Sequence, residues 1–143
     1  LSVAESCTGG MISSLITSVP GSSEYFLGSV TSYANGVKEN VLGVPAEIIA
    51  EHGAVSSECV AAMAEGVRRI TSSDYSVATS GIAGPGGGSE EKPVGTVWIG
   101  VSSDNGTETF RLKFNSDRKR NIERFSSSAL HILLNKIKKE LNN

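Results

Sequence analysis

Residues 1–19 read LSVAESCTGGMISSLITSV, and this stretch decides the fold. The short apolar segment 1–4 predicts a buried strand, and residues 5–10, ESCTGG, predict a tight turn. From Met11 to Val19 the apolar residues recur at helical spacing. A strand, a tight turn and a helix in this order predict the first unit of a parallel α/β sheet.

The remaining chain continues this alternation and ends in a hairpin. The expected strands are 26–34, 75–79, 94–101 and 107–114, the last two joined by Asp104-Asn105-Gly106. The expected helices begin near Asn35, at Pro45 (through His52), at Ser56 (to about Ile70) and at a cap formed by Asn115 or Ser116. We therefore predict a mixed sheet with helices on both faces, that is, a three-layer α/β/α sandwich of the α/β class.

Composition bounds the class of protein. A chain of 143 residues that is 38% hydrophobic is expected to form one globular domain, residues 1–143, rather than a disordered segment. No apolar run approaches the ~20 residues of a membrane span, so no membrane partner is expected. Two cysteines, Cys7 and Cys59, are too few for a disulfide scaffold and lack zinc-site spacing. These features predict a cytoplasmic protein, with no metal ion and no cofactor.

Charge is unevenly distributed along the chain. Residues 1–110 carry four basic and twelve acidic side chains, whereas residues 111–143 carry nine basic and three acidic ones. A basic tail is compatible with a nucleic-acid surface, or with a solvated helix face that makes a local anion contact. No aromatic residues are interleaved with the basic ones on the helix face, so we favour the second interpretation and expect no nucleic-acid partner.

Three loops, 5–10, 33–38 and 80–93, are expected at the carboxyl edge of the parallel strands, where α/β sheets place their sites. Ser6 lies in the first of them, between a strand and a helix start. It could act as a nucleophile, with backbone amides near residues 8–10 facing an oxyanion. Alternatively, Ser6 or Thr8 simply caps the helix.

A serine nucleophile needs a base within hydrogen-bond reach. His52 at a helix end and His131 inside the last helix are interpreted as structural. Lys38 is the only Lys or Arg among the first 67 residues. It could serve if burial and a neighbouring cation lower its pKa from about 10.4 toward ~7–8, but it could equally be a solvated helix lysine.

Other candidates are weaker. The two Ser-x-x-Lys matches, Ser89 to Lys92 and Ser116 to Lys119, lie in a loop and at a helix cap, and we discount both. Cys7 is a competing nucleophile, but it should face away from Ser6 if the strand continues.

The glycine-rich run at 81–88 could cradle a phosphate or merely supply turns. It is not a Walker motif, because no Gly-Lys-Ser/Thr follows. Arg118, at the start of the last helix, could add a donor to a phosphate.

Four ordered motifs resemble the CinA C-terminal domain family, which includes the nicotinamide-nucleotide amidohydrolases. They are AESCTGG at 4–10, YAN at 33–35 followed by Lys38, SGIAGP at 80–85 and EKPVGTVW at 91–98. The resemblance runs from Leu1 to about the last helix. It implies hydrolysis of the carboxamide of nicotinamide mononucleotide to nicotinate mononucleotide and ammonia, by a metal-independent serine–lysine mechanism.

The resemblance assigns Ser6 as nucleophile and Lys38 as base, with Tyr33 in support. With the turn and the glycine run included, the expected substrate-binding residues are Thr8, Gly9, Gly10, Asn35, Thr79, Ser80, Gly81, Gly84 and Arg118. The expected partner is the small-molecule nucleotide, and the chain is expected to be a homo-oligomer.

Two further expectations accompany the resemblance. Family chains carry a helix before the first strand, so an N-terminal helix or an upstream domain is expected to be missing here. The alternative function is a non-catalytic nucleotide-binding or protein-interaction module of a larger protein of this family.

Overall fold

The chain forms a five-stranded mixed sheet flanked by helices in a computed structural model that describes residues 1–143. The strands are β1 (Ser2–Glu5), β2 (Gly28–Thr31), β3 (Ser76–Gly81), β4 (Thr96–Ser103) and β5 (Gly106–Lys113). Their order across the sheet is β2-β1-β3-β4-β5. β1 runs parallel to both β2 and β3, whereas β4 and β5 form the antiparallel hairpin. The predicted mixed sheet is confirmed.

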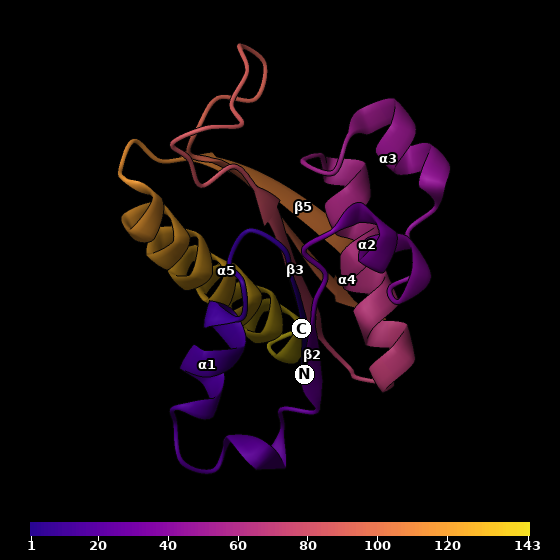
Figure 1. The fold of residues 1–143 in the computed structure, drawn as a ribbon. Helices are drawn as coiled ribbons and strands as arrows, with labels where there is room; N and C mark the ends of the chain where they lie inside the picture. The colour runs from indigo at the N-terminus through magenta and orange to yellow at the C-terminus, as the bar shows by residue number, and fades with distance from the viewer.

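Helices cover both faces of this sheet (Figure 1). The helices are α1 (Met11–Thr17), α2 (Asn35–Asn40), α3 (Ala46–His52), α4 (Ser57–Thr71) and α5 (Arg118–Leu141), with a short 3-10 turn, η1, at Ser22–Glu24. α1 and α5 pack on one face, and α4 crosses the other with α2 and α3 beside it. The α/β/α sandwich is therefore confirmed, with its glycine-rich loop projecting beyond one edge of the sheet (Figure 1).

Alternation along β1 divides the core into two layers. Val3 packs with the buried residues beneath α1 and α5, and its neighbour Ala4 packs with those beneath α4. Successive strand side chains point to opposite faces, so a central strand covered on both sides buries all of its side chains. The same alternation places Ser6 and Cys7 on opposite sides where the strand ends.

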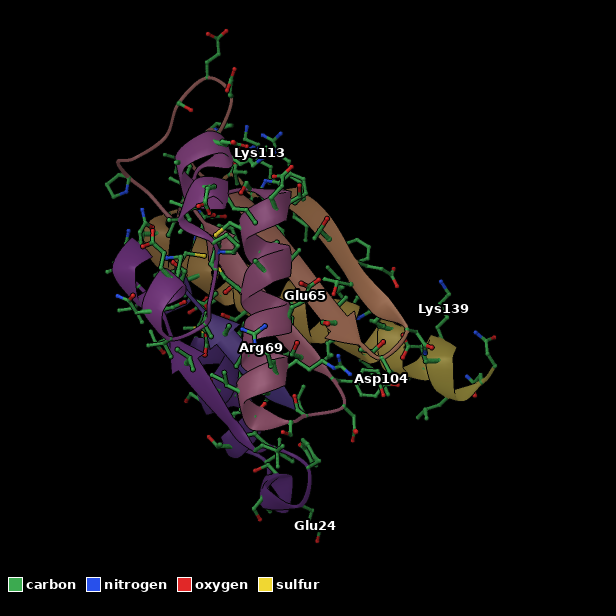
Figure 2. The ribbon with its side chains drawn as sticks, turned by 90° about the vertical axis from the view of Figure 1, so that its right-hand side faces the viewer. Glu24, Glu65, Arg69, Asp104, Lys113 and Lys139 are labelled. Carbon is green, nitrogen blue, oxygen red and sulfur yellow. The ribbon has the colours of Figure 1, made fainter.

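The view onto the α4 face shows the long axis of the sheet (Figure 2). α4 lies across it with Glu65 and Arg69, while Asp104 marks the hairpin turn and Lys113 the far end of β5 (Figure 2). Arg68 pairs with Asp104 and so ties the end of α4 to the turn. The carboxyl edge of β1 and β3 lies at the opposite end of the sheet from this turn, because β4 returns antiparallel.

Helix starts follow the expected capping chemistry with one correction. Ser56 caps α4 as predicted, accepting the amide of Cys59 at 3.2 Å. The cap of α5 is Asp117, which accepts the amide of Arg120 at 2.9 Å, so the prediction of Asn115 or Ser116 is wrong. A carboxylate accepts from a helix amide more strongly than a hydroxyl or amide oxygen does.

The second strand is shorter than predicted. β2 ends at Thr31, whereas the sequence pattern suggested 26–34. Ser32 still donates its amide to Glu5, but the carbonyls of Ser32 and Tyr33 turn to the amine of Lys38 and leave the sheet. The expected β-rich segment therefore ends early because its last carbonyls accept hydrogen bonds from a side chain.

None of the helices combines the length and the apolarity needed to cross a bilayer.

Candidate active site

The three loops predicted at the carboxyl edge of the sheet meet around one cavity of about 270 Å³. Eight of the residues expected in the site line it, namely Ser6, Tyr33, Asn35, Lys38, Ser80, Gly81, Gly84 and Arg118. They come from the ends of β1 and β3, from α2 and the turn before it, from the glycine-rich loop and from the start of α5. The topology thus gathers segments more than 100 residues apart in the sequence.

Ser6 and Lys38 are in direct contact at the floor of this cavity. The Nζ of Lys38 lies 3.1 Å from the Oγ of Ser6, although 32 positions separate the two residues. Ser6 directly follows β1, and Lys38 lies within α2, which begins at Asn35. The Lys38 side chain is only 1% exposed, so the interpretation of Lys38 as a solvated helix lysine is wrong.

No carboxylate accompanies the buried amine of Lys38. Its other acceptors are two neutral backbone carbonyls, Ser32 O at 2.7 Å and Tyr33 O at 3.2 Å. Burial lowers the pKa of Lys38 below its ordinary 10.5, and the thiols of Cys59 and Cys7 oppose this only in part. Burial alone lowers this pKa, so the expected contribution of a neighbouring cation is wrong.

A buried carboxylate organises the turn that carries Ser6. Glu5 is fully buried at the end of β1. Its Oε1 accepts from the Thr8 hydroxyl at 2.7 Å and from the Ile12 amide at 2.9 Å. Its Oε2 accepts from the amide and the hydroxyl of Ser13, at 3.1 and 2.7 Å. Glu5 therefore satisfies the first turn of α1, and the suggestion that Ser6 or Thr8 caps this helix is wrong.

This arrangement determines which backbone amides remain near Ser6. The amides of Ile12 and Ser13 are taken by Glu5, and the amide of Gly9 donates to Ser6 O at 3.1 Å. The amides of Cys7, Thr8 and Gly10 donate no hydrogen bond within the chain. The turn can close this tightly because Gly9 and Gly10 adopt φ values of 59° and 104°, which glycine tolerates.

Arg118 links three segments at the rim of the cavity. It donates from Nη1 to Gly84 O at 2.7 Å and from Nη2 to the Tyr33 hydroxyl at 3.2 Å. The Tyr33 side chain is 63% exposed, and its hydroxyl lies at Arg118, while its backbone carbonyl lies at Lys38. Tyr33 therefore contacts both Lys38 and Arg118 through different atoms.

Four predicted substrate-binding residues do not line the cavity. They are Thr8, Gly9, Gly10 and Thr79. The hydroxyls of Thr8 and Thr79 lie 2.9 Å apart in the buried layer below the turn, where Thr8 also donates to Glu5. The structure assigns these residues to the support of the turn and not to the wall of the cavity.

The side chains of the remaining candidates take no part in this serine–lysine contact. Cys7 packs into the core beneath α1 and α5, and burial raises its pKa to about 12, so the thiol stays protonated at neutral pH. His52 contacts Glu51 and Glu58, and His131 contacts Asn135, so neither histidine lines the cavity. In the Ser89 to Lys92 match, the hydroxyl accepts the backbone amide of Lys92 at 3.0 Å and not its amine.

Sequence reasoning missed several contributors. Glu5 was overlooked although an acidic residue inside an apolar strand is itself a signal, because carboxylates are rarely buried without partners. Ala54 and Val55, between α3 and α4, and Ile82 supply apolar wall to the cavity. No sequence pattern marks Ala54 and Val55, because their place depends on how α3 packs against α4, whereas Ile82 belongs to the SGIAGP motif and its part in the wall was not predicted.

Fold and site together define an α/β/α sandwich with a serine–lysine pair at the carboxyl edge of its parallel strands. The model of the CinA C-terminal domain matches residues 1–137, and the chain belongs to that family. A CinA-like protein of Pseudothermotoga lettingae is 51% identical over 94% of this chain, and one of Desulfosudis oleivorans is 51% identical over 96%. The chain spans about a third, 33%, of the length of each of these two relatives.

Solved structures carry the same fold. The competence damage-inducible protein A of Klebsiella pneumoniae superposes with a TM-score of 0.92 at 35% identity, covering 96% of this chain and 85% of that one. A competence/damage inducible protein of Agrobacterium tumefaciens gives a TM-score of 0.91 at 37% identity, covering 93% and 82%. The predicted family is therefore confirmed, and the names of these proteins state no reaction.

Proposed function

We propose that the chain is an amidohydrolase that converts nicotinamide mononucleotide to nicotinate mononucleotide and ammonia. The observation that carries the proposal is the 3.1 Å contact between the Lys38 amine and the Ser6 hydroxyl, with the amine buried and without a carboxylate partner. A neutral amine poised on a serine is a base, whereas an ion-paired lysine is not. The substrate follows from the family resemblance of the four motifs.

The hydrogen bonds around Lys38 orient its lone pair. A neutral amine has two N–H bonds, and the carbonyls of Ser32 and Tyr33 accept both. The lone pair then faces the Ser6 hydroxyl. Lys38 removes the hydroxyl proton while Ser6 Oγ bonds to the carboxamide carbon, which gives a tetrahedral intermediate and a Lys38 ammonium.

Collapse of the intermediate breaks the C–N bond. The departing ammonia takes a proton from the Lys38 ammonium, or from the Tyr33 hydroxyl, which the Lys38 ammonium then reprotonates; either way Lys38 is neutral again and an acyl ester remains on Ser6. Water, deprotonated by neutral Lys38, then attacks the ester and releases the carboxylate, which restores the serine. Water and amide are consumed, ammonia and acid are formed, and no metal or cofactor enters these steps.

The free amides of the turn after Ser6 are the donors we assign to the oxyanion. Cys7, which lines the cavity, and Thr8 have unused amides next to the nucleophile. A single donor of this kind contributes about 2.7–4 kcal/mol to transition-state stabilisation. Gly9, by contrast, holds the turn closed through its bond to Ser6 O.

The rim of the cavity orients the substrate. Val55 and Ile82 provide apolar wall for the pyridine ring, and the glycine-rich loop with Arg118 binds the 5′-phosphate. Arg118 uses two of its five N–H donors on Gly84 and Tyr33, which leaves donors for an anion. Glu5 already accepts from the first turn of α1, so that helix end does not bind the phosphate.

Substitution of the pair tests the reaction. Ser6→Ala and Lys38→Ala are each expected to reduce ammonia release by about 10³-fold or more, because nucleophile and base act as a unit. The measurement is coupled detection of ammonia from nicotinamide mononucleotide, with circular dichroism as the control for folding. Near-normal turnover by either variant would remove that residue from the mechanism.

Arg118→Ala tests the phosphate assignment. The expected result is mainly a raised KM, because a grip on the phosphate acts in ground state and transition state alike. Steady-state kinetics with nicotinamide mononucleotide and with its dephosphorylated riboside provide the comparison, since the riboside should be insensitive to the substitution. A loss confined to kcat would contradict the phosphate role.

We extend the proposal to the whole protein as follows. Residues 1–143 form one catalytic domain of a cytoplasmic homo-oligomer that uses neither metal nor cofactor. The contrasting hypothesis is a binding module without catalysis. Nicotinamide mononucleotide bound in equilibrium dialysis, with no ammonia released over hours, would favour the module.

A further inference from the structure

Glu5 has a place in this site that its helix-capping role alone does not describe. It is a fully buried carboxylate whose two oxygens each accept two hydrogen bonds. Hydrogen bonds to a carboxylate are stronger than those between neutral groups, so these four bonds hold Glu5 and the groups of Thr8, Ile12 and Ser13 firmly in place. The residue next to it in the chain is Ser6.

Two separate parts of Glu5 reach the two members of the reactive pair. Its carboxylate holds Thr8 and the first turn of α1, and so fixes the loop in which Ser6 stands. Its backbone carbonyl accepts the amide of Ser32 at 2.7 Å. The carbonyl of Ser32 in turn accepts from Lys38 Nζ at 2.7 Å. A short chain of hydrogen bonds thus runs from the Glu5 carbonyl to Lys38, and Ser6 follows Glu5 directly in the loop that the carboxylate holds.

The support extends sideways to β3. Thr8 Oγ1, bound to Glu5, also lies 2.9 Å from Thr79 Oγ1, and the amide of Ser6 donates to Thr79 O at 3.2 Å. Thr79 is the residue paired with Glu5 in the sheet register. The turn is therefore held at its base by Glu5 and at its side by Thr79.

We propose that Glu5 is a positioning residue that sets the distance between Ser6 Oγ and Lys38 Nζ and the orientation of the free amides beside Ser6. It touches neither substrate nor reacting atoms. This inference rests on the proposed function for its kinetic consequence, but its geometric content concerns the serine–lysine pair alone. A shift of about 1 Å between reacting groups can cost a factor of about 10² in rate.

The test is Glu5→Gln, which keeps the shape of the side chain but replaces one acceptor oxygen by an NH2 group. That NH2 group would face two donors, either the amide and hydroxyl of Ser13 or the Thr8 hydroxyl and the Ile12 amide. Glu140→Gln is the matched control, because it makes the same chemical change in a hydrogen-bonded carboxylate of α5 outside the cavity. Both variants are expected to unfold at lower temperature. Only Glu5→Gln is expected to lower kcat, by about 10²-fold per folded molecule, with KM within about threefold.

Reactivity of Ser6 provides a readout that a purely structural role would not move. The second-order rate of modification by phenylmethylsulfonyl fluoride, followed by intact mass with Ser6→Ala as blank, is expected to fall at least tenfold in Glu5→Gln and to stay within twofold in Glu140→Gln. If Glu5→Gln does not fold, Thr8→Val removes one of the four donors at nearly constant volume and should lower the rate about threefold.

A crystal structure of Glu5→Gln, or of Thr8→Val in its place, decides the geometry without any turnover. The expected result is a Ser6–Lys38 contact that opens beyond hydrogen-bond reach, with the contact intact in Glu140→Gln. Wild-type protein that releases no ammonia would refute the proposed function and leave this structural comparison decisive. An unchanged contact together with an unchanged modification rate would overturn the role of Glu5.

Discussion

Two lysines are buried in this domain, and the sequence surrounds them with opposite partners. The amine of Lys38 lies within hydrogen-bond distance of a serine hydroxyl and two backbone carbonyls, none of them charged. Lys136, on α5, contacts Glu108 and Glu140, each at 2.9 Å. Lys139, three positions further along α5, lies at the hairpin end of the molecule (Figure 2). The two lysines are therefore similarly buried but have different kinds of partner.

The difference appears in the pKa values. Burial lowers the pKa of Lys38, and no carboxylate reverses the shift. Burial acts in the same direction on Lys136, but Glu108 and Glu140 overcome it and raise its pKa above 10.5. A buried amine without a carboxylate partner favours its neutral form and so can accept a proton, whereas an amine in an ion pair stays an ammonium. The neighbours of each amine therefore decide its role: Lys38 can act as a base at one end of the sheet, and Lys136 forms stabilising ion pairs at the other.

The largest effect is expected when each of the two lysines, Lys38 and Lys136, is replaced by an apolar side chain of similar length. Lys38→Met is expected to reduce ammonia release by about 10³-fold or more with only a small change in melting temperature, because removal of a buried amine that has no carboxylate partner offsets the loss of its hydrogen bonds to the Ser32 and Tyr33 carbonyls. Lys136→Met is expected to keep wild-type kcat and KM. Parallel kinetics and thermal unfolding of both variants provide the measurement, and an active Lys38→Met protein would end the distinction.

The pH dependence of the rate provides the next test. Protonated Lys38 cannot act as a base, so log(kcat/KM) is expected to rise by about one per pH unit and then level off at the pKa of Lys38, below 10.5. A rate profile from pH 5 to 10 would locate this limb. The limb should be unchanged in Lys136→Met. A rate independent of pH over this range would refute a titrating Lys38.

How far the sequence predicts this contrast depends on the element. The strand and turn at 1–10, the cap at Ser56 and the hairpin turn at Asp104 follow local rules, and the structure confirms them. The Ser6–Lys38 pair was predicted in part by elimination of the histidines and by resemblance to the family. The environment of the Lys38 amine was not predicted. The carbonyls of Ser32 and Tyr33 reach this amine only because β2 ends early, at Thr31.

Glu5 shows where local rules fail, and Asp117 shows where a local rule was applied to the wrong residue, since aspartate is itself a preferred helix cap. Serine and threonine near a helix start are good caps, but in both places a carboxylate one or more positions away takes the amides instead. For Glu5 the reason is tertiary, since the end of a central strand points its side chain under the next helix. Lys136 and Glu108 likewise meet only because α5 packs back across the hairpin, 28 positions away.

Stability provides a smaller test of the same contrast. Lys136→Met removes hydrogen bonds to two carboxylates, and its free energy of unfolding should fall by about 1.5–3 kcal/mol, the range for bonds to charged groups. Urea unfolding at pH 7 measures this loss. Combining it with Glu108→Gln should cost less than the sum of the two single changes, because both remove one shared bond. Strict additivity would show that the two side chains do not interact.

The smallest expected effect is on the acid side and concerns Glu140. Hydrogen bonds from Lys136, and then from Ser103 and Tyr75, lower the pKa of Glu140 from 4.5 to about 2. A carboxyl whose folded pKa is depressed stabilises the fold above its unfolded pKa and loses that contribution as the pH falls toward the folded value. Unfolding free energies measured at intervals from pH 5 to 2 should therefore fall less steeply in Glu140→Gln than in wild type. Lys38→Met should keep the wild-type slope in this window, because Lys38 has no carboxylate partner whose titration could change there. An equally steep fall in Glu140→Gln would show that Glu140 does not carry the acid sensitivity, and the cohesive half of the comparison would then depend on Glu108 alone.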